Sequence, residues 1–578
     1  MSLMRGNLPS FRGKFFRKFL GNFKNQNRCI STNPDDHPNI LKSDSKDIVV
    51  PDATLPEIIY NKMQQFPNYI ATESAATGKK YTFEQIHVKS KNLSKHLRHK
   101  FGLKEGDIVA FYMPNLPEYT ICFLGALDAR LIVTTMNHLY TPDEIAIQII
   151  DASPKLIFTQ SHLLNTLKSA LKISNRDLPT IIVKDRQDES IPRDTVDFFE
   201  LTDTAIDVPD SPPGNSADVA IIPYSSGTTG LPKGVQLCHK NLIANLLQIV
   251  SPDFKYLKEP SGDFQEITPA VLPFYHIFGM AMNFLYLYCG VRTVALAKFA
   301  PDTYIEALKK YRPTFISGAP PLVFFLTSHQ DVKPEYLKNL RNLTSGAAPL
   351  GYSDEEKFLK KVGRSDVTIF QGYGLTETSP GITYFNKYHV RSEENSGSVG
   401  KLLPNTIMKI ANVDDPRGEP LGVNQRGEIL IKGPQVMKGY YKKPQETQNT
   451  FADGWLRTGD IGYYKEDKYI WISDRLKELI KVKGYQVAPA ELEAVIRAFP
   501  SVEDAAVVGV PHAKFGEAPR AFVVPKKGVQ FKPEELEAYV AEKVAPYKKL
   551  TGGIAIIDSI PKNPAGKILR KKIKEEFL

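Results

Sequence analysis

One segment of the chain combines the residue types that bind phosphate groups. It runs Tyr224-Ser225-Ser226-Gly227-Thr228-Thr229-Gly230-Leu231-Pro232-Lys233-Gly234, directly after a β-rich run. Its glycines let the backbone approach a ligand closely and turn N–H groups inward, its hydroxyl groups add donors, and Lys233 supplies positive charge. The segment therefore predicts a loop that holds phosphates.

The order of residues in this loop differs from that of a Walker A loop. A Walker A loop needs Lys followed by Ser or Thr at the start of a helix, whereas here Pro232 precedes Lys233 and Gly234 follows it. Runs of Ser, Thr and Gly also form flexible linkers. The bounded length and the embedded Pro-Lys-Gly favour a binding loop over a linker.

Six further motifs follow the phosphate loop along the chain. They are residues 273–279, 345–350, 371–377, 455–460, 473–484 and 561–571. Together with residues 224–234 they resemble the signature motifs of the adenylate-forming superfamily, which contains acyl-CoA synthetases, 4-coumarate:CoA ligases, firefly luciferases and peptide-synthetase adenylation domains. The resemblance extends from about residue 52 to the C-terminus, and the agreement of successive motifs in order makes it specific.

The resemblance implies a two-step reaction. Members of the superfamily activate a carboxylic acid with ATP to an acyl-adenylate and pyrophosphate, then pass the acyl group to a thiol, usually that of CoA. Negative charge gathers at the α-phosphate in the first transition state, so fixed donors and cations are needed there. We therefore expect an ATP- and Mg²⁺-dependent ligase that joins a fatty or aryl carboxylic acid to CoA.

The resemblance also assigns a role to residues around the nucleotide. Thr376 would contact the α-phosphate, and Glu377 would bind Mg²⁺, a hard cation that prefers oxygen ligands. Tyr373 would stack on adenine, and Asp460 would accept both ribose hydroxyls, with Arg475 nearby as a charged donor. The other residues of the predicted nucleotide site are Ser225, Ser226, Gly227, Thr228, Thr229, Gly230, Lys233, Gly346, Ala347, Ala348, Gln371, Gly372 and Gly374.

Several C-terminal residues match family positions that act in one or other step. Lys567 matches the lysine that bridges the attacking carboxylate and the α-phosphate, since one charge on a flexible stem reaches both. Lys477 occupies the hinge about which the small domain turns between an adenylating and a thioester-forming pose. In the second pose Lys481 would be catalytic, and Lys483 and Gly484 would face the adenylate and CoA. Without the surrounding motifs, each lysine would be a solvated surface residue.

His276 lies in an aromatic, uncharged stretch, where a lone histidine is by default a core residue. Its match to the family histidine beside the substrate carboxylate makes gating or orienting that group an equal alternative. The stretch has no Asp to bind an amine, and no carrier domain follows Lys567, so amino acids are poor candidate substrates. The predicted walls of the acid pocket are Ile277, Phe278, Ser317, Gly318, Ala347 and Gly372.

These motifs need a scaffold in which strands and helices alternate. From about residue 52 to 430, short β-rich runs alternate with longer helix-like stretches, which predicts an α/β body with largely parallel sheets. The clearest predicted elements are the strands 108–112, 156–159, 181–183 and 219–224 and the helices 117–129 and 241–250. Short strands broken by Pro and Gly at 400–431 predict a small β subdomain. We expect an AMP-binding adenylation domain over 34–474 and a small, mobile α+β lid domain over 475–578.

Residues 1–34 carry seven of the charges in the net +10 of the chain and contain no acidic side chain. Wound as a helix, residues 11–24 place phenylalanines on one half and basic residues on the other. Such a segment is typical of a mitochondrial transit peptide, which predicts a transit peptide over 1–33, cleavage near residue 30 and a matrix location. A solvated tail and a membrane-surface anchor are the alternatives.

The composition and the remaining sequence signals exclude several classes. With 578 residues, 42% hydrophobic and 24% charged, the chain is typical of a soluble multidomain protein. The longest uncharged run, 267–291, contains Pro, His and Gly residues that favour a loop entering a buried helix over a transmembrane span. The four cysteines show no disulfide or metal pattern, as suits a reducing compartment. The C-terminal Leu578 does not end a Ser-Lys-Leu peroxisomal signal.

Two other functions stay open. A luciferase-like monooxygenase acting on an adenylated acid would carry the same motifs. A basic nucleic-acid or membrane-binding protein would need a continuous basic patch with stacking aromatic residues, whereas most C-terminal basic residues fall within or near the ligase motifs. We therefore expect a small carboxylic acid, ATP and CoA as partners and no nucleic acid; the sequence indicates no oligomeric state.

Overall fold

The computed structural model of the protein describes residues 34–578 apart from 185, 187, 188, 226–231, 349, 477, 483–484, 513–514, 531, 545 and 564–565, and it describes the backbone alone at 475, 481, 485 and 486. The predicted transit peptide, 1–33, lies outside the described residues and stays a prediction. Within the described part, no helix has both the length and the apolarity needed to cross a membrane.

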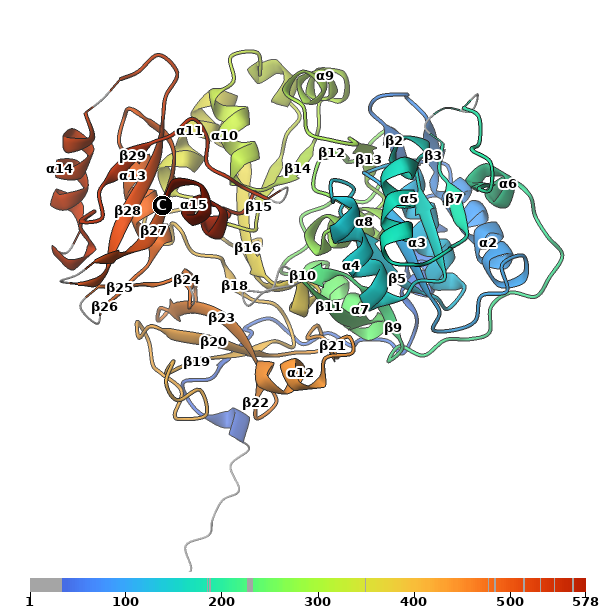
Figure 1. The fold of residues 1–578 in the computed structure, drawn as a ribbon, viewed down its shortest axis with the longest axis horizontal. Coiled ribbons are helices and arrows are strands. Elements are labelled where there is room, and N and C mark those ends of the chain that lie inside the picture. The colour runs from blue at the N-terminus through green and yellow to red at the C-terminus, as the bar shows by residue number, and fades with distance from the viewer. Residues whose placement is uncertain are drawn as a thin grey trace, which may run out of the picture.

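The largest sheet of the body is built mainly of parallel strands in the order β10-β11-β9-β5-β4-β6-β7-β8, with β21 beside β11 (Figure 1). All of β4 (Ile108–Tyr112) is buried, because Val109 and Phe111 pack in one core cluster and Ala110 and Tyr112 in another. A strand covered on both faces needs a continuous hydrophobic sequence. The other strands are β5 (Ile132–Met136), β6 (Leu156–Thr159), β7 (Thr180–Ile182), β8 (Val196–Asp197), β9 (Val219–Ile222), β10 (Tyr224–Ser225), β11 (Lys233–Cys238) and β21 (Gly439–Tyr440).

Two smaller sheets complete the α/β part of the body. One has the order β12-β13-β2-β3 and the other the order β14-β15-β16-β17-β18, and the first three strands of each run parallel. Their bounds are β2 (Ile70–Ser74), β3 (Lys80–Thr82), β12 (Ile267–Ala270), β13 (Arg292–Ala295), β14 (Phe315–Gly318), β15 (Asn342–Ser345), β16 (Thr368–Gly374), β17 (Gly381–Tyr384) and β18 (Lys401–Leu402). The parallel strands β14, β15 and β16 direct their C-terminal ends towards one edge, where motif residues gather.

The small β subdomain is an antiparallel sheet with the order β1-β19-β20-β23-β22 and β24 beside β23. Its strands are β1 (Leu41–Lys42), β19 (Ile407–Ala411), β20 (Gly427–Lys432), β22 (Phe451–Ala452), β23 (Trp455–Tyr464) and β24 (Ile470–Arg475). The strand β1 comes from the start of the described chain and pairs with β19, and Asp35 forms an ion pair with Lys432 at 2.7 Å. The N-terminal residues therefore form one edge of this sheet.

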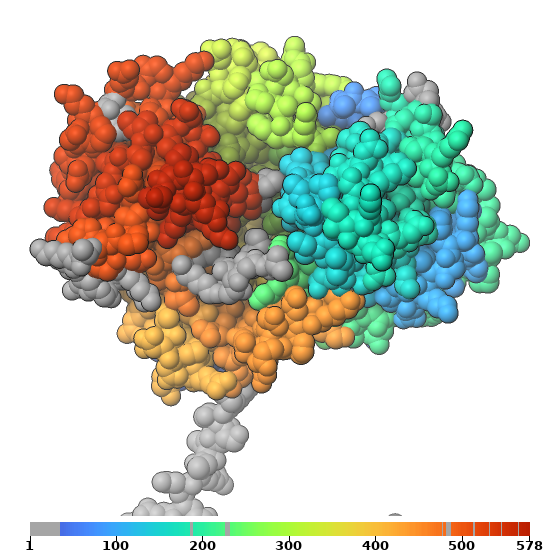
Figure 2. All heavy atoms as spheres, in the orientation of Figure 1, coloured from blue at the N-terminus to red at the C-terminus, as the bar shows by residue number. Residues whose placement is uncertain are grey.

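The C-terminal unit has its own sheet, β26-β25-β28-β27 with β29 beside β28, and its own core cluster. Its strands are β25 (Ile480–Val482), β26 (Tyr485–Val487), β27 (Val502–His512), β28 (Gly516–Pro525) and β29 (Ile554–Ile556). The predicted domain boundary at 474/475 falls at the end of β24. Figure 2 shows this unit, in red, packed against the yellow-green and orange parts of the body.

Helices cover the sheets of both units. They are α1 (Leu55–Met63), α2 (Phe83–His99), α3 (Pro117–Asp128), α4 (Pro142–Ala152), α5 (Leu164–Ile173), α6 (Phe198–Asp203), α7 (His239–Ile249), α8 (Ile277–Cys289), α9 (Pro301–Tyr311), α10 (Pro320–Ser328), α11 (Tyr352–Val362), α12 (Pro444–Thr450), α13 (Pro489–Arg497), α14 (Pro533–Lys543) and α15 (Arg570–Phe577). Many begin with Pro, whose fixed φ suits the first helical position and whose missing N–H is not needed there.

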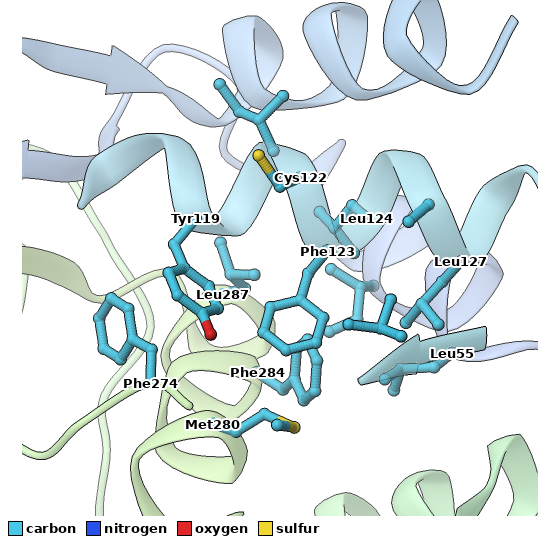
Figure 3. Packing of buried hydrophobic residues seen from close by; sticks show 14 of the residues in the cluster. Leu55, Tyr119, Cys122, Phe123, Leu124, Leu127, Phe274, Met280, Phe284 and Leu287 are labelled. Carbon is cyan, nitrogen blue, oxygen red and sulfur yellow. The ribbon is translucent and has the colours of Figure 1, made fainter. Parts of the chain in front are cut away.

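The buried helices α3 and α8 pack directly on each other (Figure 3). The rings of Phe123 and Phe284 meet edge to face with centroids 5.3 Å apart, and Tyr119 meets Phe274 at 5.7 Å. Such edge-to-face pairs stabilise a core beyond the area that they bury. This packing fixes the position of α8 in the body.

The predicted fold class is confirmed: a large α/β body with parallel-rich sheets, a small β subdomain and a small α+β C-terminal domain. One detail of the 267–291 prediction is wrong, since its first residues form strand β12 rather than a loop before the buried helix. Of the four cysteines, Cys122, Cys238 and Cys289 are free and buried, and Cys29 lies outside the described residues.

Candidate functional site

A cavity of about 1040 Å³ lies where the body, the β subdomain and the C-terminal unit meet. Motif residues from all three parts line it: Ser225, Lys233, His276, Gly346, Ala347, Gly372, Tyr373, Gly374, Thr376 and Glu377 from the body, Arg457, Thr458 and Gly459 from the β subdomain, and Lys567 from the C-terminal unit. Since these residues come from motifs spread over more than half of the chain, the fold itself brings the predicted site together. The cavity has a polar end and a long apolar extension.

Glu377 is held at the polar end by two hydroxyl groups. It lies in a 3₁₀ turn (Thr376–Thr378) directly after β16. The Ser225 hydroxyl, at the start of the phosphate loop, and the Tyr440 hydroxyl each donate to Oε1 of Glu377 at 3.0 Å. Both contacts fall on one oxygen, and the residues that the structure describes give the other, Oε2, no hydrogen bond. One carboxylate oxygen is thereby oriented in a residue that lines the cavity.

Tyr440 is a site residue that the motifs did not predict. Its ring also lies beneath the Lys233 ammonium, 5.1 Å from the ring centroid, and its strand β21 pairs with β11, which carries Lys233. Burial and the neighbouring Glu377 raise the pKa of Tyr440, so its hydroxyl stays a donor. Gly439-Tyr440 stands outside the seven motifs, and only the pairing of distant strands reveals its place. Tyr440 thus contacts both the Glu377 carboxylate and the Lys233 ammonium.

The predicted ribose and adenine residues lie side by side. The Tyr373 hydroxyl donates to Oδ2 of Asp460 at 2.7 Å, and Asp460 is only 3% exposed. Asp460 pairs across the sheet with Arg475, whose backbone alone is described. Tyr373 lines the cavity, whereas Asp460 lies behind it as a support. The predicted contacts of Asp460 with ribose stay a prediction.

Among the described residues of the predicted nucleotide site, three do not line the cavity: Ala348, Gln371 and Asp460. Gln371 is buried, and its amide binds both backbone groups of Leu350, accepting from N–H at 3.0 Å and donating to C=O at 2.9 Å. It also donates to Glu355 at 2.9 Å. Gln371 therefore fixes the segment after Gly346, and its contact with nucleotide stays a prediction. Ala348, in that segment, is likewise absent from the wall.

The glycines of this region are required by close approaches of the chain. A Cβ on Gly374 would lie 1.8 Å from the carbonyl oxygen of Pro380, and one on Gly372 would lie 2.8 Å from the Tyr384 ring. A Cβ on Gly346 would crowd the Phe278 ring at 3.1 Å. Side chains at 372 and 374 would displace neighbours that shape the cavity.

His276 is the partly buried N-cap residue of α8 and lines the cavity. Burial lowers its pKa from 6.5 to about 4, so the ring is neutral at physiological pH. Nδ1 accepts a hydrogen bond from the N–H of Phe278 at 3.3 Å, which leaves the ring proton on Nε2. The histidine can therefore offer a neutral N–H donor, as an orienting group for a carboxylate would require.

The apolar extension runs along two helices. The lining residues of α8 recur every three or four positions from Phe278 to Cys289, and those of α7 from Leu242 to Ile249. The apolar residues of both helices that line it are Leu242, Leu246, Ile249, Ile277, Phe278, Ala281, Met282, Phe284, Leu285 and Cys289. This spacing places one face of each helix on the cavity. At about 1.5 Å per residue, the α8 face alone extends roughly 16 Å from Phe278 to Cys289.

The predicted acid pocket is only partly reproduced. Ile277, Phe278, Ala347 and Gly372 line the cavity as predicted. Ser317 does not, and its hydroxyl is hydrogen-bonded to Tyr286, which is also absent from the wall. Gly318 is also absent from the wall, and a Cβ there would meet the Leu322 side chain at 2.4 Å.

The C-terminal unit contributes Lys562, Asn563, Lys567 and Leu569 to the cavity. Lys567 Nζ lies 4.0 Å from Glu478, and Arg570 binds the same carboxylate at 2.7 Å. Of the other predicted residues, Ser226, Gly227, Thr228, Thr229, Gly230, Lys477, Lys483 and Gly484 lie outside the described residues, as does the Lys481 side chain. Their roles stay predictions.

The polar end fits a magnesium ion bound together with phosphates. Within the described ranges no cluster of three or more metal-binding side chains occurs, so a metal held by protein alone is not supported there. Mg²⁺ is commonly held by one or two carboxylates plus substrate phosphates. Glu377, with one oxygen fixed by hydroxyl donors, supplies the carboxylate, and Lys233, above the Tyr440 ring, supplies positive charge for the phosphates.

Proteins of known function match this chain over most of its length. A family model described as AMP-binding enzyme matches residues 59–441, and one described as AMP-binding enzyme C-terminal domain matches 491–567. The chain is 36% identical over 549 residues to 4-coumarate–CoA ligase 1 of Arabidopsis thaliana, covering 93% of this chain and 95% of that protein. It is 37% identical over 504 residues to 4-coumarate–CoA ligase 1 of Petroselinum crispum, covering 87% and 90%.

Solved structures share the whole architecture. ATP-bound MatB of Rhodopseudomonas palustris superposes with a TM-score of 0.80 at 28% identity, covering 91% of this chain and 99% of that one. A benzoate CoA ligase of Burkholderia xenovorans LB400 superposes with a TM-score of 0.79 at 22% identity, covering 90% and 99%, and shares the fold.

Proposed function

Because the chain belongs to the AMP-binding, adenylate-forming enzyme family, we propose that it is an ATP- and Mg²⁺-dependent acid:CoA ligase acting on a fatty acid. One observation carries the proposal: a single cavity joins Thr376, Glu377 and Lys567 to an apolar channel between α7 and α8. A reactive acid head and a nucleotide can meet only where these two parts join.

In the first half-reaction a carboxylate oxygen of the acid attacks the α-phosphorus of ATP, and pyrophosphate leaves with the electron pair of the broken P–O bond. The neutral His276 donates from Nε2 to the acid carboxylate and orients it. Lys567, on the cavity wall, bridges the carboxylate and the α-phosphate, where negative charge accumulates. Thr376 donates its hydroxyl to the same phosphate.

Glu377 would hold the magnesium that accompanies ATP, and the bound ion would neutralise phosphate charge. Ser225 and Tyr440 orient the carboxylate for this purpose through Oε1. Lys233 adds positive charge beside the phosphate loop.

In the second half-reaction the CoA thiol loses its proton to solvent and its sulfur attacks the acyl carbon; the bond from that carbon to the phosphate oxygen breaks, and AMP leaves with the electron pair. This step follows a turn of the C-terminal domain about Lys477, after which Lys481, Lys483 and Gly484 face the adenylate. The support for this turn is the family resemblance of residues 473–484. The adenylate stays in the body while Lys567 withdraws with its domain.

The fatty-acid assignment is supported by the length and chemistry of the channel. Apolar side chains line one face of α8 from Phe278 to Cys289, roughly 16 Å at about 1.5 Å per residue. An aryl acid would occupy only the part next to Gly346 and Gly372. A flexible alkyl chain can fill the apolar channel along its whole length.

A screen of acids tests the function. Purified protein is incubated with ATP, Mg²⁺ and fatty acids of increasing length, benzoate or cinnamate, with and without CoA, and AMP and thioester are measured. We expect AMP and acyl-CoA with fatty acids and weaker turnover of the aryl acids. No product from any acid contradicts the ligase, and preference for an aryl acid contradicts the fatty-acid assignment alone.

We also propose a mitochondrial matrix location for the enzyme. The acid-free, basic residues 1–34 support it. The test compares the full chain with a chain starting at residue 34, both fused to a fluorescent protein. Import and shortening of the full chain alone are expected, and a diffuse signal from both contradicts the proposal.

A further inference from the structure

Beside the cavity, the residue that follows the predicted hinge lies close to the lysine assigned to adenylation. Glu478 Oε1 is 4.0 Å from the Lys567 ammonium, although the two residues are far apart in the sequence. Their side chains are 22% and 30% exposed, so the pair is partly shielded from water. Shielding makes such an ion pair stronger than one on the open surface.

The Glu478 carboxylate is itself fixed. Its Oε2 accepts a hydrogen bond from Arg570 Nη1 at 2.7 Å. Arg570, the first residue of α15, also donates to Glu493 at 2.7 Å and to the carbonyl of Val507 at 3.2 Å. Glu493 is buried and accepts the Val507 N–H at 2.8 Å. The Glu478 carboxylate, which faces Lys567, is therefore linked through Arg570 to the buried Glu493 of the C-terminal domain.

The 4.0 Å between Glu478 Oε1 and Lys567 Nζ suits a contact that orients the ammonium without a hydrogen bond. It lies beyond hydrogen-bond range, so the ammonium can form bonds to substrate oxygens without first breaking one to Glu478. A lysine side chain otherwise samples many rotamers, and restricting them towards the reacting position lowers the cost of ordering the side chain. Charge attraction from a fixed carboxylate provides that restriction.

The backbone of the loop that carries Lys567 is also held by hydrogen bonds. Lys567 N–H donates to the Asn563 side chain at 2.8 Å, and the Lys567 carbonyl accepts the Asn563 N–H at 2.8 Å. Gly566 packs against the start of α10, where a Cβ on it would lie 3.1 Å from Ala319. The loop sets the origin of the lysine stem, and Glu478 sets the direction of its charged end.

We propose that Glu478 is a positioning residue for the first half-reaction, holding the Lys567 ammonium where it reaches the acid carboxylate and the α-phosphate. The assignment rests on the proposed ligase function. Glu478 follows Lys477 and is bonded to Arg570, so it turns with the C-terminal domain. Lys567 and Glu478 then enter and leave the cavity together, and the second half-reaction does not need Glu478.

Glu478→Gln isolates the charge. The amide oxygen can still accept from Arg570, while the negative charge facing Lys567 is lost. Adenylate formation is measured by acid-dependent exchange of pyrophosphate into ATP, and thioester formation by reaction of supplied acyl-adenylate with CoA. We expect adenylate formation to fall roughly tenfold, within the range of measured couplings between contacting residues, and thioester formation to stay within about twofold.

A double-mutant cycle separates positioning from a structural role. In a Lys567→Ala background, Glu478→Gln should cause no further loss of adenylate formation, because there is no ammonium to hold. The control is Glu575→Gln, which removes an exposed carboxylate 3.7 Å from Lys571 on α15 and should change neither half-reaction. If Glu478→Gln fails to fold, Glu478→Asp is put through the same cycle, since it keeps the charge but withdraws it from Lys567.

Three results overturn the assignment. These are unchanged adenylate formation in Glu478→Gln, equal loss of both half-reactions, or a further loss in the Lys567→Ala background. If the wild-type protein is active with some acid, these outcomes reject the positioning role and leave the ligase intact. If the wild-type protein forms no adenylate with any acid, the proposed function fails and the assignment fails with it.

Discussion

Blocking the apolar channel at two depths should shorten the range of acids that the enzyme accepts by two different amounts. Ala281 and Cys289 both line the cavity from α8. Counted from His276 at about 1.5 Å per residue, they lie roughly 7.5 and 20 Å along the helix. With C–C bonds of about 1.5 Å, an extended alkyl chain advances about 1.3 Å per methylene, so these depths correspond to about the sixth and the fifteenth carbon.

The magnitude follows from the methylenes excluded. Burial of one methylene is worth about 0.8 kcal/mol, or roughly a fourfold change in kcat/KM. In Ala281→Phe a twelve-carbon acid would leave about five methylenes outside the channel, a loss of about 4 kcal/mol or roughly a thousandfold. A six-carbon acid should keep its kcat/KM, and Cys289→Phe should affect only acids longer than about fourteen carbons.

The assay is kcat/KM for a series of saturated acids from four to eighteen carbons, measured for the wild type and both variants. The short acids serve as the internal control, and the melting temperature reports any overpacking, which typically costs about 1 to 3 kcal/mol. Equal loss at every chain length in Ala281→Phe would refute the channel, as would identical length limits in the two variants.

Three other predictions follow from the site and the core. Lys567→Ala should slow adenylate formation but spare thioester formation from supplied acyl-adenylate; equal loss of both, measured separately, contradicts its role. Tyr440→Phe keeps the ring beneath Lys233 but removes a donor to Glu377, so the Mg²⁺ concentration needed for half-maximal ATP binding, measured by calorimetry, should rise about tenfold; an unchanged titration contradicts this. Burial, with Arg130 adding to it, lowers the pKa of His239 from 6.5 to about 4, so the neutral form stabilises the fold above about pH 6.5, and this contribution is lost as the pH falls towards 4. His239→Asn should reduce the loss of unfolding free energy across that range by about 3 kcal/mol in denaturant titrations, and an unchanged pH slope would exclude His239 as the cause.

Sequence patterns predicted best where one local force dominates. The strands 108–112 and 156–159 agree with β4 and β6 because continuous hydrophobic runs suit strands buried on both faces. The helix predicted over 117–129 is α3, which begins at Pro117. In contrast, Pro269 obscured strand β12, which tolerates it because β12 is the edge of its sheet.

The site residues divide in the same way. The motif positions Glu377, Tyr373 and Lys567 gather at one cavity as the resemblance implied. The contacts of Tyr440 with Glu377 and of Arg570 with Glu478 join residues 63 and 92 positions apart, and no local pattern encodes such pairs. Gln371 belongs to a motif but supports a turn, so motif membership predicts the neighbourhood of a residue better than its contact.

The pairing of β1 with β19 limits where a shortened form of the protein can begin. Removing residues through Lys42 would delete β1 and the Asp35–Lys432 ion pair, leaving β19 as an unprotected sheet edge. Exposed edges of this kind pair with other chains and promote aggregation. Shortened forms for expression should therefore retain Asp35, and any proteolytic maturation that leaves a soluble enzyme must end upstream of it.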